Sequence, residues 1–229
     1  AVAALALAHG GSQPSTRIQG VPGDVTDLDA LERLWDAAAA ISPVDFWINN
    51  AGRAHDMESL WALEPEVVAE VINANVVGVA YGSRVAMIHM QEQGHGQLFN
   101  MEGWGSDGKV RAGMSVYGAS KAAVRSLTRA LTEETKETPV LVGTISPGMV
   151  VTDLLLDPLK HDPESFQESK RIFNILADKI ETVCPWLTEQ MLANEEHGAQ
   201  INWLTRSKIM RRFATARFSR RDVFDDEQT

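Results

Sequence analysis

The sequence predicts an α/β fold in which the strands of one parallel sheet alternate with helices. Short runs of β-branched and aromatic residues are each followed by a longer stretch with helical periodicity, which is the order expected of a parallel sheet. No internal repeat and no linker rich in Pro, Gly or Ser divides the 229 residues, so one domain over 1–229 is expected. With 44% hydrophobic and 23% charged residues, the chain can bury one substantial core.

The elements follow from local signals along the chain. Thr26 with Asp29 three residues later predicts the start of a helix, and Pro43 predicts a stop after it. The expected elements are strand 17–21, a helix from Thr26 toward Pro43, strand 44–48, helix 65–91, strand 97–101, helix 115–134 and strand 140–145.

Composition excludes several classes of protein. A net charge of −10 and a pI near 5.1 argue against a protein that binds nucleic acid duplexes, because phosphate neutralisation needs a basic face. Cys184 is the only cysteine, so no intrachain disulfide is expected and a reducing compartment is favoured. No apolar run reaches the roughly 20 residues that span a bilayer, and Ala1 begins no signal peptide. We expect a cytoplasmic protein, soluble or peripheral at a membrane surface, with no metal site.

The most informative motif is Tyr117-Gly118-Ala119-Ser120-Lys121. Residues four apart lie on one face of a helix, so the pattern sets a phenol beside an ammonium group. A fixed cation stabilises the phenolate and lowers the pKa of tyrosine from about 10 toward neutrality, as acid–base catalysis requires. The alternative for an isolated Tyr-x-x-x-Lys is a packed ring and a solvated amine.

Three further motifs accompany this pair in a fixed order. Asn49-Asn50-Ala51-Gly52 and Ser146-Pro147-Gly148-Met149 each follow a predicted strand, and Asn75 lies within a predicted helix. Strand ends of a parallel sheet collect around a ligand at its carboxyl edge. The combination resembles the short-chain dehydrogenase/reductase family over most of the chain. The resemblance implies a Rossmann-type doubly wound parallel sheet, a nicotinamide cofactor (NADP or NAD, with NADPH favoured) and a homo-oligomer when full length.

The resemblance also implies roles for individual residues. Tyr117 would protonate the carbonyl oxygen, Lys121 would lower the pKa of Tyr117 and bond the nicotinamide ribose, and Asn75 would hold a water that links Lys121 to solvent. Asn75 could instead bond helix backbone. The residues implied to contact the cofactor are Asp24, Val25, Asn50, Ala51, Gly52, Tyr117, Lys121, Pro147, Gly148, Met149 and Thr152. Asp24 could equally cap a turn, and Pro147-Gly148 could be a turn alone.

The beginning of the chain departs from the family. The first strand, its glycine-rich phosphate-binding turn and the second strand are missing, and Gly10-Gly11 follows no strand. We therefore expect a sheet without its first two strands, a sequence that is a fragment of a longer chain, and weak dinucleotide binding by the fragment alone.

The catalytic serine of the family is displaced. At its usual spacing, about thirteen residues before Tyr117, this sequence has Trp104. Ser106 is the nearest hydroxyl, and the surrounding glycines could bend the loop to bring it to the substrate oxygen. The alternative is a solvated loop serine. Glu102 is a further candidate.

The displaced loop is itself specific. Asn100-Met101-Glu102-Gly103-Trp104-Gly105-Ser106-Asp107-Gly108 resembles the chlorophyll(ide) b reductase branch of the family, as do the segments around 46–52, 146–155 and 173–177. This resemblance implies reduction of the C7 formyl group of chlorophyll b or chlorophyllide b. The alternatives are a reductase of another hydrophobic carbonyl (steroid, quinone or fatty aldehyde) or a non-catalytic binding protein with the same fold.

Two segments after Thr152 bear on the substrate. An apolar lid or ordinary core is expected from Leu154, Leu155, Leu156, Leu159, Phe166, Ile172, Phe173 and Ile175. The C-terminal extension 206–229 is basic and then acidic. Its cations could contact an anionic membrane, although a solvated helix face is the commoner outcome: Arg206, Lys208, Arg211, Arg212, Arg217, Arg220 and Arg221.

Overall fold

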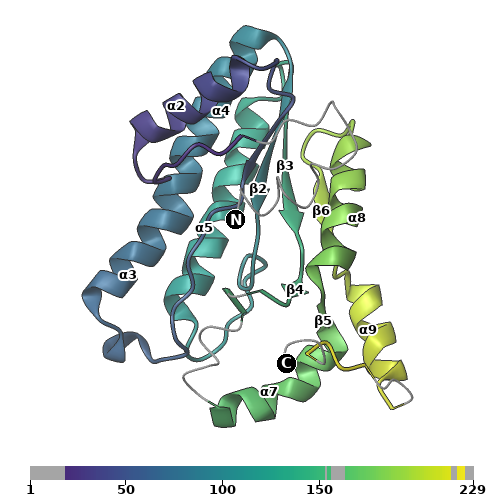
Figure 1. Ribbon diagram of the computed structural model, residues 1–229. Helices are drawn as coiled ribbons and strands as arrows, with labels where there is room; N and C mark the ends of the chain where they lie inside the picture. Colours follow the sequence, from purple (N-terminus) through teal and green to yellow (C-terminus); the bar gives the residue numbers. More distant parts are fainter. Residues whose placement is uncertain (1–18, 153, 156–162, 218–220, 225–229) are drawn as a thin grey trace.

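The computed structural model describes residues 19–152, 154–155, 163–217 and 221–224, with the side chains of 163–169 left aside. Four parallel strands form the central sheet in the order β1-β2-β3-β6 (Figure 1). They are β1 (Phe46–Asn49), β2 (Gly96–Met101), β3 (Val140–Ser146) and β6 (Gln200–Asn202). All four run in one direction, so their carboxyl ends share one edge. The three strands predicted from 44–48, 97–101 and 140–145 are therefore confirmed.

The strand predicted at 17–21 is wrong for residues 19–21, and residues 17 and 18 lie outside the described part of the chain. Gln19, Gly20 and Val21 form no regular structure. Residues 19–21 pair with none of the described strands, although β1 is an edge strand with no described strand on its second side. A strand is stabilised by its hydrogen-bonded neighbours, and an extended segment without them is not one.

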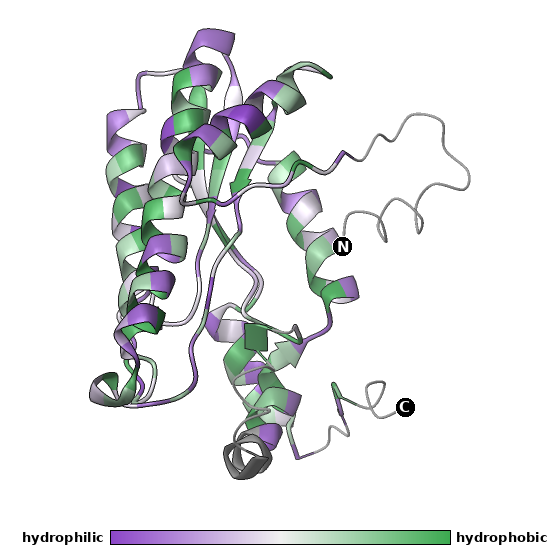
Figure 2. Cartoon of the chain, turned by 60° about the vertical axis from the view of Figure 1, so that its left-hand side comes forward, coloured by the Kyte–Doolittle hydropathy of each residue, from purple (hydrophilic) through white to green (hydrophobic). Residues whose placement is uncertain are grey.

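Helices cover both faces of the sheet. The helices α2 (Leu28–Ala39), α3 (Pro65–Ile72), α4 (Gly78–Gln93) and α5 (Ser115–Glu134) lie on one side, and α8 (Ile180–Leu192) lies on the other (Figure 1). Adjacent residues of β2 show the two cores: Leu98 packs with α2 and α4, whereas Phe99 packs with Val183 and Leu187 of α8. The central strands β2 and β3 are buried on both faces, as in doubly wound sheets, whereas Ile48 of β1 is exposed. In Figure 2 the helices alternate between hydrophilic and hydrophobic colours, as expected when one face of each is buried.

Two local predictions need correction. The cap of α2 is Asp27 and not Thr26, because the Asp27 carboxylate accepts from the Asp29 backbone N–H at 3.0 Å. Thr26 instead binds Asp24. The helix predicted over 65–91 is interrupted by η2 (Asn73–Val77), a π-helical turn between α3 and α4. The continuous helical stretch Pro65–Gln93 is long and apolar enough to cross a membrane, but half of its apolar window is buried inside this fold.

Part of the last third of the chain forms a small layer beyond the central sheet. It contains β4 (Met149–Val150), α7 (Pro163–Leu176), β5 (Ala177–Asp178) and α9 (Arg206–Thr215); the short η1 (Leu60–Ala62) lies earlier in the chain. Strand β4 pairs with β5 in parallel. The layer has its own apolar cluster, which is formed by Val151, Phe173, Val223 and Phe224.

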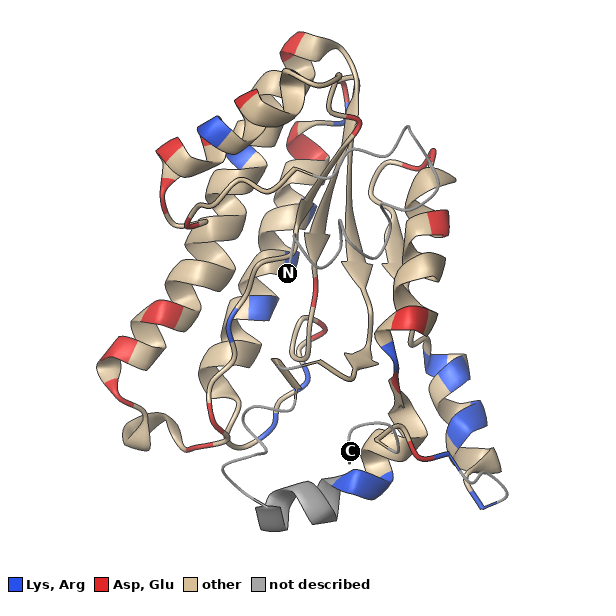
Figure 3. Cartoon of the chain, in the orientation of Figure 1, with Lys and Arg blue, Asp and Glu red and all other residues tan. Residues whose placement is uncertain are grey.

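One buried carboxylate connects this layer to the C-terminal segment. Asp178, at the end of β5, forms ion pairs with Arg212 at 2.8 Å and Arg221 at 2.7 Å. Its carboxylate also accepts a 2.6 Å hydrogen bond from the Trp203 indole N–H. We call these four residues the Asp178 cluster. The two arginines also donate to backbone carbonyls of residues 175–177. Part of the basic stretch is therefore internal structure. Figure 3 shows the basic residues along α9.

The other predicted basic residues differ in their surroundings. Lys208 lies over the Trp203 ring, 2.9 Å from its centroid, while Arg206, Arg211 and Arg217 are exposed. Arg220 and the acidic residues 225–227 lie outside the described residues. The membrane-contact hypothesis therefore depends on fewer cations than the sequence suggests.

Removing the carboxylate of the Asp178 cluster should destabilise the protein. We expect Asp178→Ala to lower the free energy of unfolding by about 3 kcal/mol, because two guanidinium groups lose their buried counter-charge. Urea denaturation measures the difference. Glu133→Ala, which removes an exposed partner 3.9 Å from Lys136, is the matched control and should change little. Equal decreases in the free energy of unfolding of the two variants would show that the Asp178 cluster stabilises the protein no more than an exposed ion pair does.

Candidate active site

Helix α5 places Tyr117 and Lys121 together at the carboxyl edge of the sheet, as predicted. The Lys121 ammonium lies 5.9 Å from the centre of the Tyr117 ring and donates a 3.1 Å hydrogen bond to the Met101 carbonyl at the end of β2. Lys121 is almost fully buried, with 4% of its surface exposed. The helix periodicity and the strand end together hold the ammonium beside the phenol.

The pKa values of the pair differ from the prediction in one respect. Burial raises the pKa of Tyr117 to about 12, so the expected lowering by Lys121 is not seen. Burial also lowers the pKa of Lys121 to about 8, while the negative charge of Glu102 acts in the opposite direction. Desolvation therefore dominates at both groups. The phenol carries its proton at neutral pH, which is the form a proton donor needs.

A histidine that sequence reasoning missed holds the start of α5. The Tyr117 backbone N–H donates to His55 Nε2 at 3.3 Å, and His55 Nδ1 lies 2.7 Å from the Asp56 carbonyl. A ring that accepts at Nε2 and donates at Nδ1 is the neutral tautomer. His55 thus satisfies a backbone donor in the first turn of the helix that carries Tyr117. The only sequence signal was its position shortly after the β1 strand end.

Asn75 is fully buried within the π-helical turn, where it joins two parts of the site. Its amide group donates to the Arg53 carbonyl and the Ser120 hydroxyl, both at 2.9 Å, and its oxygen accepts from the Arg53 N–H at 2.7 Å. The predicted water on Asn75 stays a prediction. The alternative of bonding helix backbone is not what is observed: Asn75 bonds a loop and a neighbouring helix. Widened π turns are common at functional sites.

Gly52 explains why the β1 loop can come close to this group. A Cβ at residue 52 would lie 3.0 Å from the Asn75 side-chain oxygen and 3.7 Å from the Lys121 ammonium nitrogen. Asn50 and Ala51 are exposed just before it. The predicted strand-end loop 50–52 therefore borders Lys121.

The loop after β2 brings Gly103 to the Tyr117 hydroxyl and places Ser106 on the Gly103 backbone. A Cβ at residue 103 would lie 2.5 Å from the Tyr117 oxygen, so the backbone passes directly beside the phenol. Ser106 is buried, and its hydroxyl oxygen accepts from the Gly103 N–H at 3.0 Å. The solvated-serine alternative is therefore wrong. Trp104, at the usual serine spacing, is 38% exposed.

Backbone contact between two glycines allows this loop to reach α5. Gly105 has φ = +91°, and a Cβ there would lie 2.6 Å from Gly118 Cα. Only glycine satisfies both the left-handed conformation and the close approach. The glycines predicted to bend the loop do so by packing it on the helix next to Tyr117.

The loop after β3 is anchored rather than open. Gly148 has φ = +72° and packs closely on Leu204, and Met149 packs against the cluster of Val151 and Phe173. The Thr152 hydroxyl lies 3.4 Å from the Val150 carbonyl, to which it donates. Pro147 precedes this turn. The structure thus places 147–152 at the carboxyl edge, while their predicted cofactor contacts stay predictions.

Asp24 and Val25 lie at the start of α2. Asp24 accepts from the Thr26 N–H and hydroxyl, both at 2.8 Å, which holds its pKa below the usual value. This is the turn-capping alternative. Val25 packs against Gly78, one turn from Asn75. Their predicted adenine contact is untested.

A buried polar network behind the site was also missed. Asn49, at the end of β1, donates to Asn100 at 2.8 Å and Ser83 at 3.1 Å, and Asn100 donates to Thr128 of α5 at 2.9 Å. The two asparagines are partners in the β1–β2 register. The sequence showed both at strand ends, but only strand pairing places them opposite one another. The network ties both strand ends to α4 and α5.

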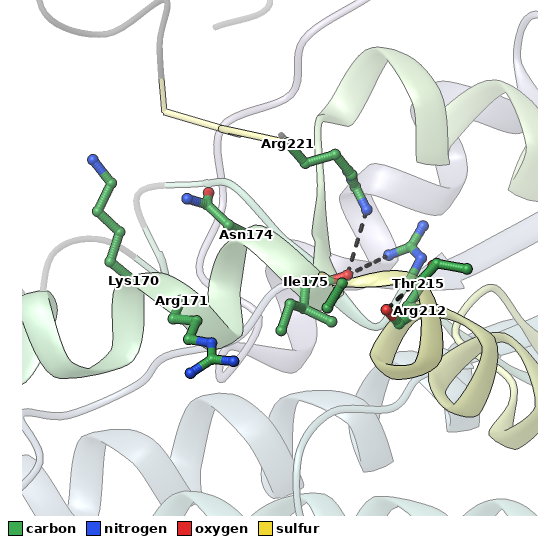
Figure 4. A pocket seen from close by; sticks show the side chains of 8 residues that line it. Lys170, Arg171, Asn174, Ile175, Arg212, Thr215 and Arg221 are labelled. Atoms are coloured by element: carbon green, nitrogen blue, oxygen red, sulfur yellow. Dashed lines mark hydrogen bonds between the residues drawn. The ribbon is translucent and has the colours of Figure 1, made fainter. Parts of the chain in front are cut away.

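The α7–α9 pocket, about 430 Å³ in volume, shares no lining residue with this site; Figure 4 shows the residues that line it. Its lining residues are Lys170, Arg171, Asn174, Ile175, Arg212, Thr215, Ala216 and Arg221. None of them was predicted for catalysis, and Arg212 and Arg221 already bind Asp178. Of the predicted lid, Phe173 is core, Leu155 and Ile175 are half-buried, and Leu154 and Ile172 are exposed. Leu156, Leu159 and the Phe166 side chain lie outside the described residues.

Comparison with known proteins agrees with this geometry. The profile of the short chain dehydrogenase family matches residues 2–161. The chain is 34% identical to a probable chlorophyll(ide) b reductase, chloroplastic, of Oryza sativa subsp. japonica over 213 residues, which are 92% of this chain and 41% of the relative. It is 33% identical to a chloroplastic chlorophyll(ide) b reductase of Arabidopsis thaliana over 188 residues, 80% of this chain and 53% of the relative.

The chain therefore spans about half or less of the length of these curated relatives. Among solved structures, the closed form of a serine dehydrogenase complexed with NADP+ superposes with a TM-score of 0.66 at 26% identity. That match covers 80% of this chain and 74% of the other. The match confirms the doubly wound parallel fold.

Proposed function

The chain belongs to the short-chain dehydrogenase family, and on that premise we propose that its protein is a nicotinamide-dependent reductase of the formyl group of chlorophyll b or chlorophyllide b. The observation that carries the proposal is the Tyr117–Lys121 pair at the carboxyl edge of the sheet, with Gly103 against the phenol hydroxyl. A side chain at residue 103 would press on that hydroxyl. Glycine leaves it accessible to a carbonyl.

The residues present suit a nicotinamide cofactor. Lys121 is a buried ammonium with three N–H groups, of which one binds Met101 and two have no partner among the described residues. Such donors fit ribose hydroxyls. Gly52 leaves room beside this ammonium, and the loops 50–52 and 147–152 border the same edge. When bound, the reduced nicotinamide supplies the hydride that the formyl carbon accepts, and it leaves oxidised.

The chain's own groups then manage the proton. The Tyr117 hydroxyl transfers its proton to the formyl oxygen as the carbon gains hydride, which gives a hydroxymethyl group and a phenolate. The phenolate regains a proton from solvent. Lys121 stabilises the transient phenolate, and the buried Ser106 hydroxyl donates to the developing charge on oxygen. Since the pKa of Tyr117 is raised to about 12, the ground state supplies the protonated phenol that reduction needs.

Three features support a large pigment as substrate. Of the two curated relatives described above, one is named a chlorophyll(ide) b reductase and the other a probable one. In the loop with Gly103, Gly105 and Ser106, the serine is displaced from its usual spacing in the family and accepts a hydrogen bond from the Gly103 N–H. Exposed apolar residues near the loop ends, including Trp104 and Leu154, offer surface for a flat macrocycle. We also propose a peripheral place at a pigment-bearing membrane, consistent with the chloroplastic relatives.

The substrate assignment predicts a preference that can be measured. The complete protein with NADPH or NADH should convert chlorophyllide b or chlorophyll b to the 7-hydroxymethyl product faster than it reduces short aliphatic aldehydes. A large apolar face adds binding free energy at roughly 25 cal/mol per Å² of buried surface, which a short aldehyde lacks. The assay follows absorption with time and confirms the product by chromatography.

Steroid, quinone and fatty aldehyde substrates should be run in parallel. Faster reduction of one of them, with the pigment unchanged, would reject the chlorophyll assignment and leave the reductase intact. Binding of pigment and cofactor without turnover of any carbonyl would favour a non-catalytic binding protein.

A further inference from the structure

A buried carboxylate next to the Tyr117–Lys121 pair has no role in the chemistry described so far. Glu102 follows β2 directly, and only 5% of its side chain is exposed. Both of its neighbours in the chain touch the pair: the Met101 carbonyl accepts from Lys121, and Gly103 lies against the Tyr117 hydroxyl. A movement of Glu102 would therefore move the two backbone contacts that seat the pair.

Helix α5 presents two cations to this carboxylate. Tyr117, Lys121 and Arg125 are successive residues four apart, so they share one face of the helix. Arg125 Nε lies 3.3 Å from Glu102 Oε1, and its terminal nitrogen donates to Gln200 in β6 at 3.1 Å. The Gln200 contact fixes the guanidinium group against the far strand.

Three charged groups and one neutral hydroxyl act on Glu102, and they come from three elements. Arg125 and Lys121 face it from α5, Thr144 from β3, and Asp107 from its own loop. Burial raises the pKa of Glu102, and Arg125 is the largest influence that opposes this. The same kind of balance acts on Lys121: burial favours the neutral amine and lowers its pKa, and the charge of Glu102 favours the cation.

We propose that Glu102 is a positioning residue, whose carboxylate, held by Arg125, keeps Lys121 charged and seated beside Tyr117. The reaction-level consequence rests on the proposed reductase function, whereas the charge pairing does not. Without the carboxylate, two cations four residues apart would face each other in a desolvated site. Lys121 would then lose its proton at lower pH, and with it the ability to stabilise the phenolate.

The decisive experiment compares Glu102→Gln with the wild type in the complete protein. The titration of Lys121 is followed by NMR on protein with ¹³C-labelled lysine side chains, and Lys121→Met identifies the signal. We expect the Lys121 midpoint to move to lower pH by about one pH unit in Glu102→Gln. The alkaline limb of the kcat profile should move in the same direction, because activity requires the cation and is lost as pH rises through the pKa of Lys121.

Control variants separate this effect from general damage. Asp107→Asn removes a more exposed carboxylate of the same loop and should leave the Lys121 midpoint in place. Glu102→Asp retains a carboxylate, so the Lys121 midpoint should move to lower pH by less than it does in Glu102→Gln. If Glu102→Gln fails to fold, the double variant Glu102→Met/Arg125→Met removes the ion pair as a unit, which buried pairs tolerate well. The Lys121 midpoint should still fall.

The outcomes are distinct. An unchanged Lys121 midpoint in folded Glu102→Gln, or an equal shift in Asp107→Asn, would overturn the proposal. A shifted midpoint in a protein that reduces no carbonyl would uphold the charge pairing and reject the proposed function. A lower kcat at every pH with no shift of midpoint or limb would mean that Glu102 has only a structural role, which also overturns the proposal.

Discussion

Tyr117→Phe should lower the turnover of the complete protein by about 10²–10⁴-fold, the usual contribution of general acid catalysis. The substitution removes the hydroxyl that lies against Gly103 and leaves the ring in place. Because Lys121 remains bonded to Met101, cofactor affinity should change far less than turnover. Steady-state kinetics and calorimetric titration of NADPH and NADH measure the two quantities separately.

The chain offers one matched control for this experiment. Tyr81, the only other tyrosine, lies on α4 and is 36% exposed, so Tyr81→Phe should behave as wild type. Unchanged turnover in Tyr117→Phe would rule out Tyr117 as the proton donor. Equal losses of turnover and cofactor affinity would indicate that the phenol binds rather than donates.

Ser106→Ala should reduce turnover by about 10²–10³-fold, the loss that follows removal of one well-aligned donor to a developing oxyanion. The Ser106 oxygen already accepts from the Gly103 N–H, so its own proton is available to another acceptor. The substitution also leaves that N–H without its partner. Measurement of kcat and KM shows whether the loss is confined to the transition state.

Ser106→Thr keeps a hydroxyl at the same position and is the matched variant. It should recover part of the turnover that Ser106→Ala loses, provided the loop accommodates one more methyl group. Wild-type turnover in a folded Ser106→Ala protein would show that another group holds the carbonyl oxygen. The Gly103 backbone beside Tyr117 would then be the next candidate for the group that holds the carbonyl oxygen.

Most of the fold could be predicted because its signals are local. The alternation of apolar runs and amphipathic stretches gave the three central strands, and the bounds 115–134 of α5 agree with the structure. The failures occur where a distant partner decides the outcome. Residues 19–21 have strand-like composition but no ladder, and Thr26 has cap chemistry but is bonded to Asp24.

The candidate site divides in the same way. Helical spacing predicted that Tyr117 and Lys121 are neighbours, and the resemblance to the family made Asn75 and Ser106 candidates. The sequence could not show that Gly103 borders the phenol or that His55 holds the first turn of α5. These contacts join segments about 14 to 62 residues apart in the chain, and no local pattern records them.

The helix face that pairs a phenol with an ammonium can be predicted from the sequence alone, because residue spacing in a helix sets which side chains are neighbours. The sequence also predicts that the polar motifs follow strands, and parallel strands end at one edge. The electrostatics of the pair, in contrast, depend on tertiary packing. Burial raises the pKa of Tyr117 and lowers that of Lys121, and Glu102 and Arg125 supply opposing charges from the strand end and the helix. Desolvation depends on everything packed around a group, so it is a property of the folded chain.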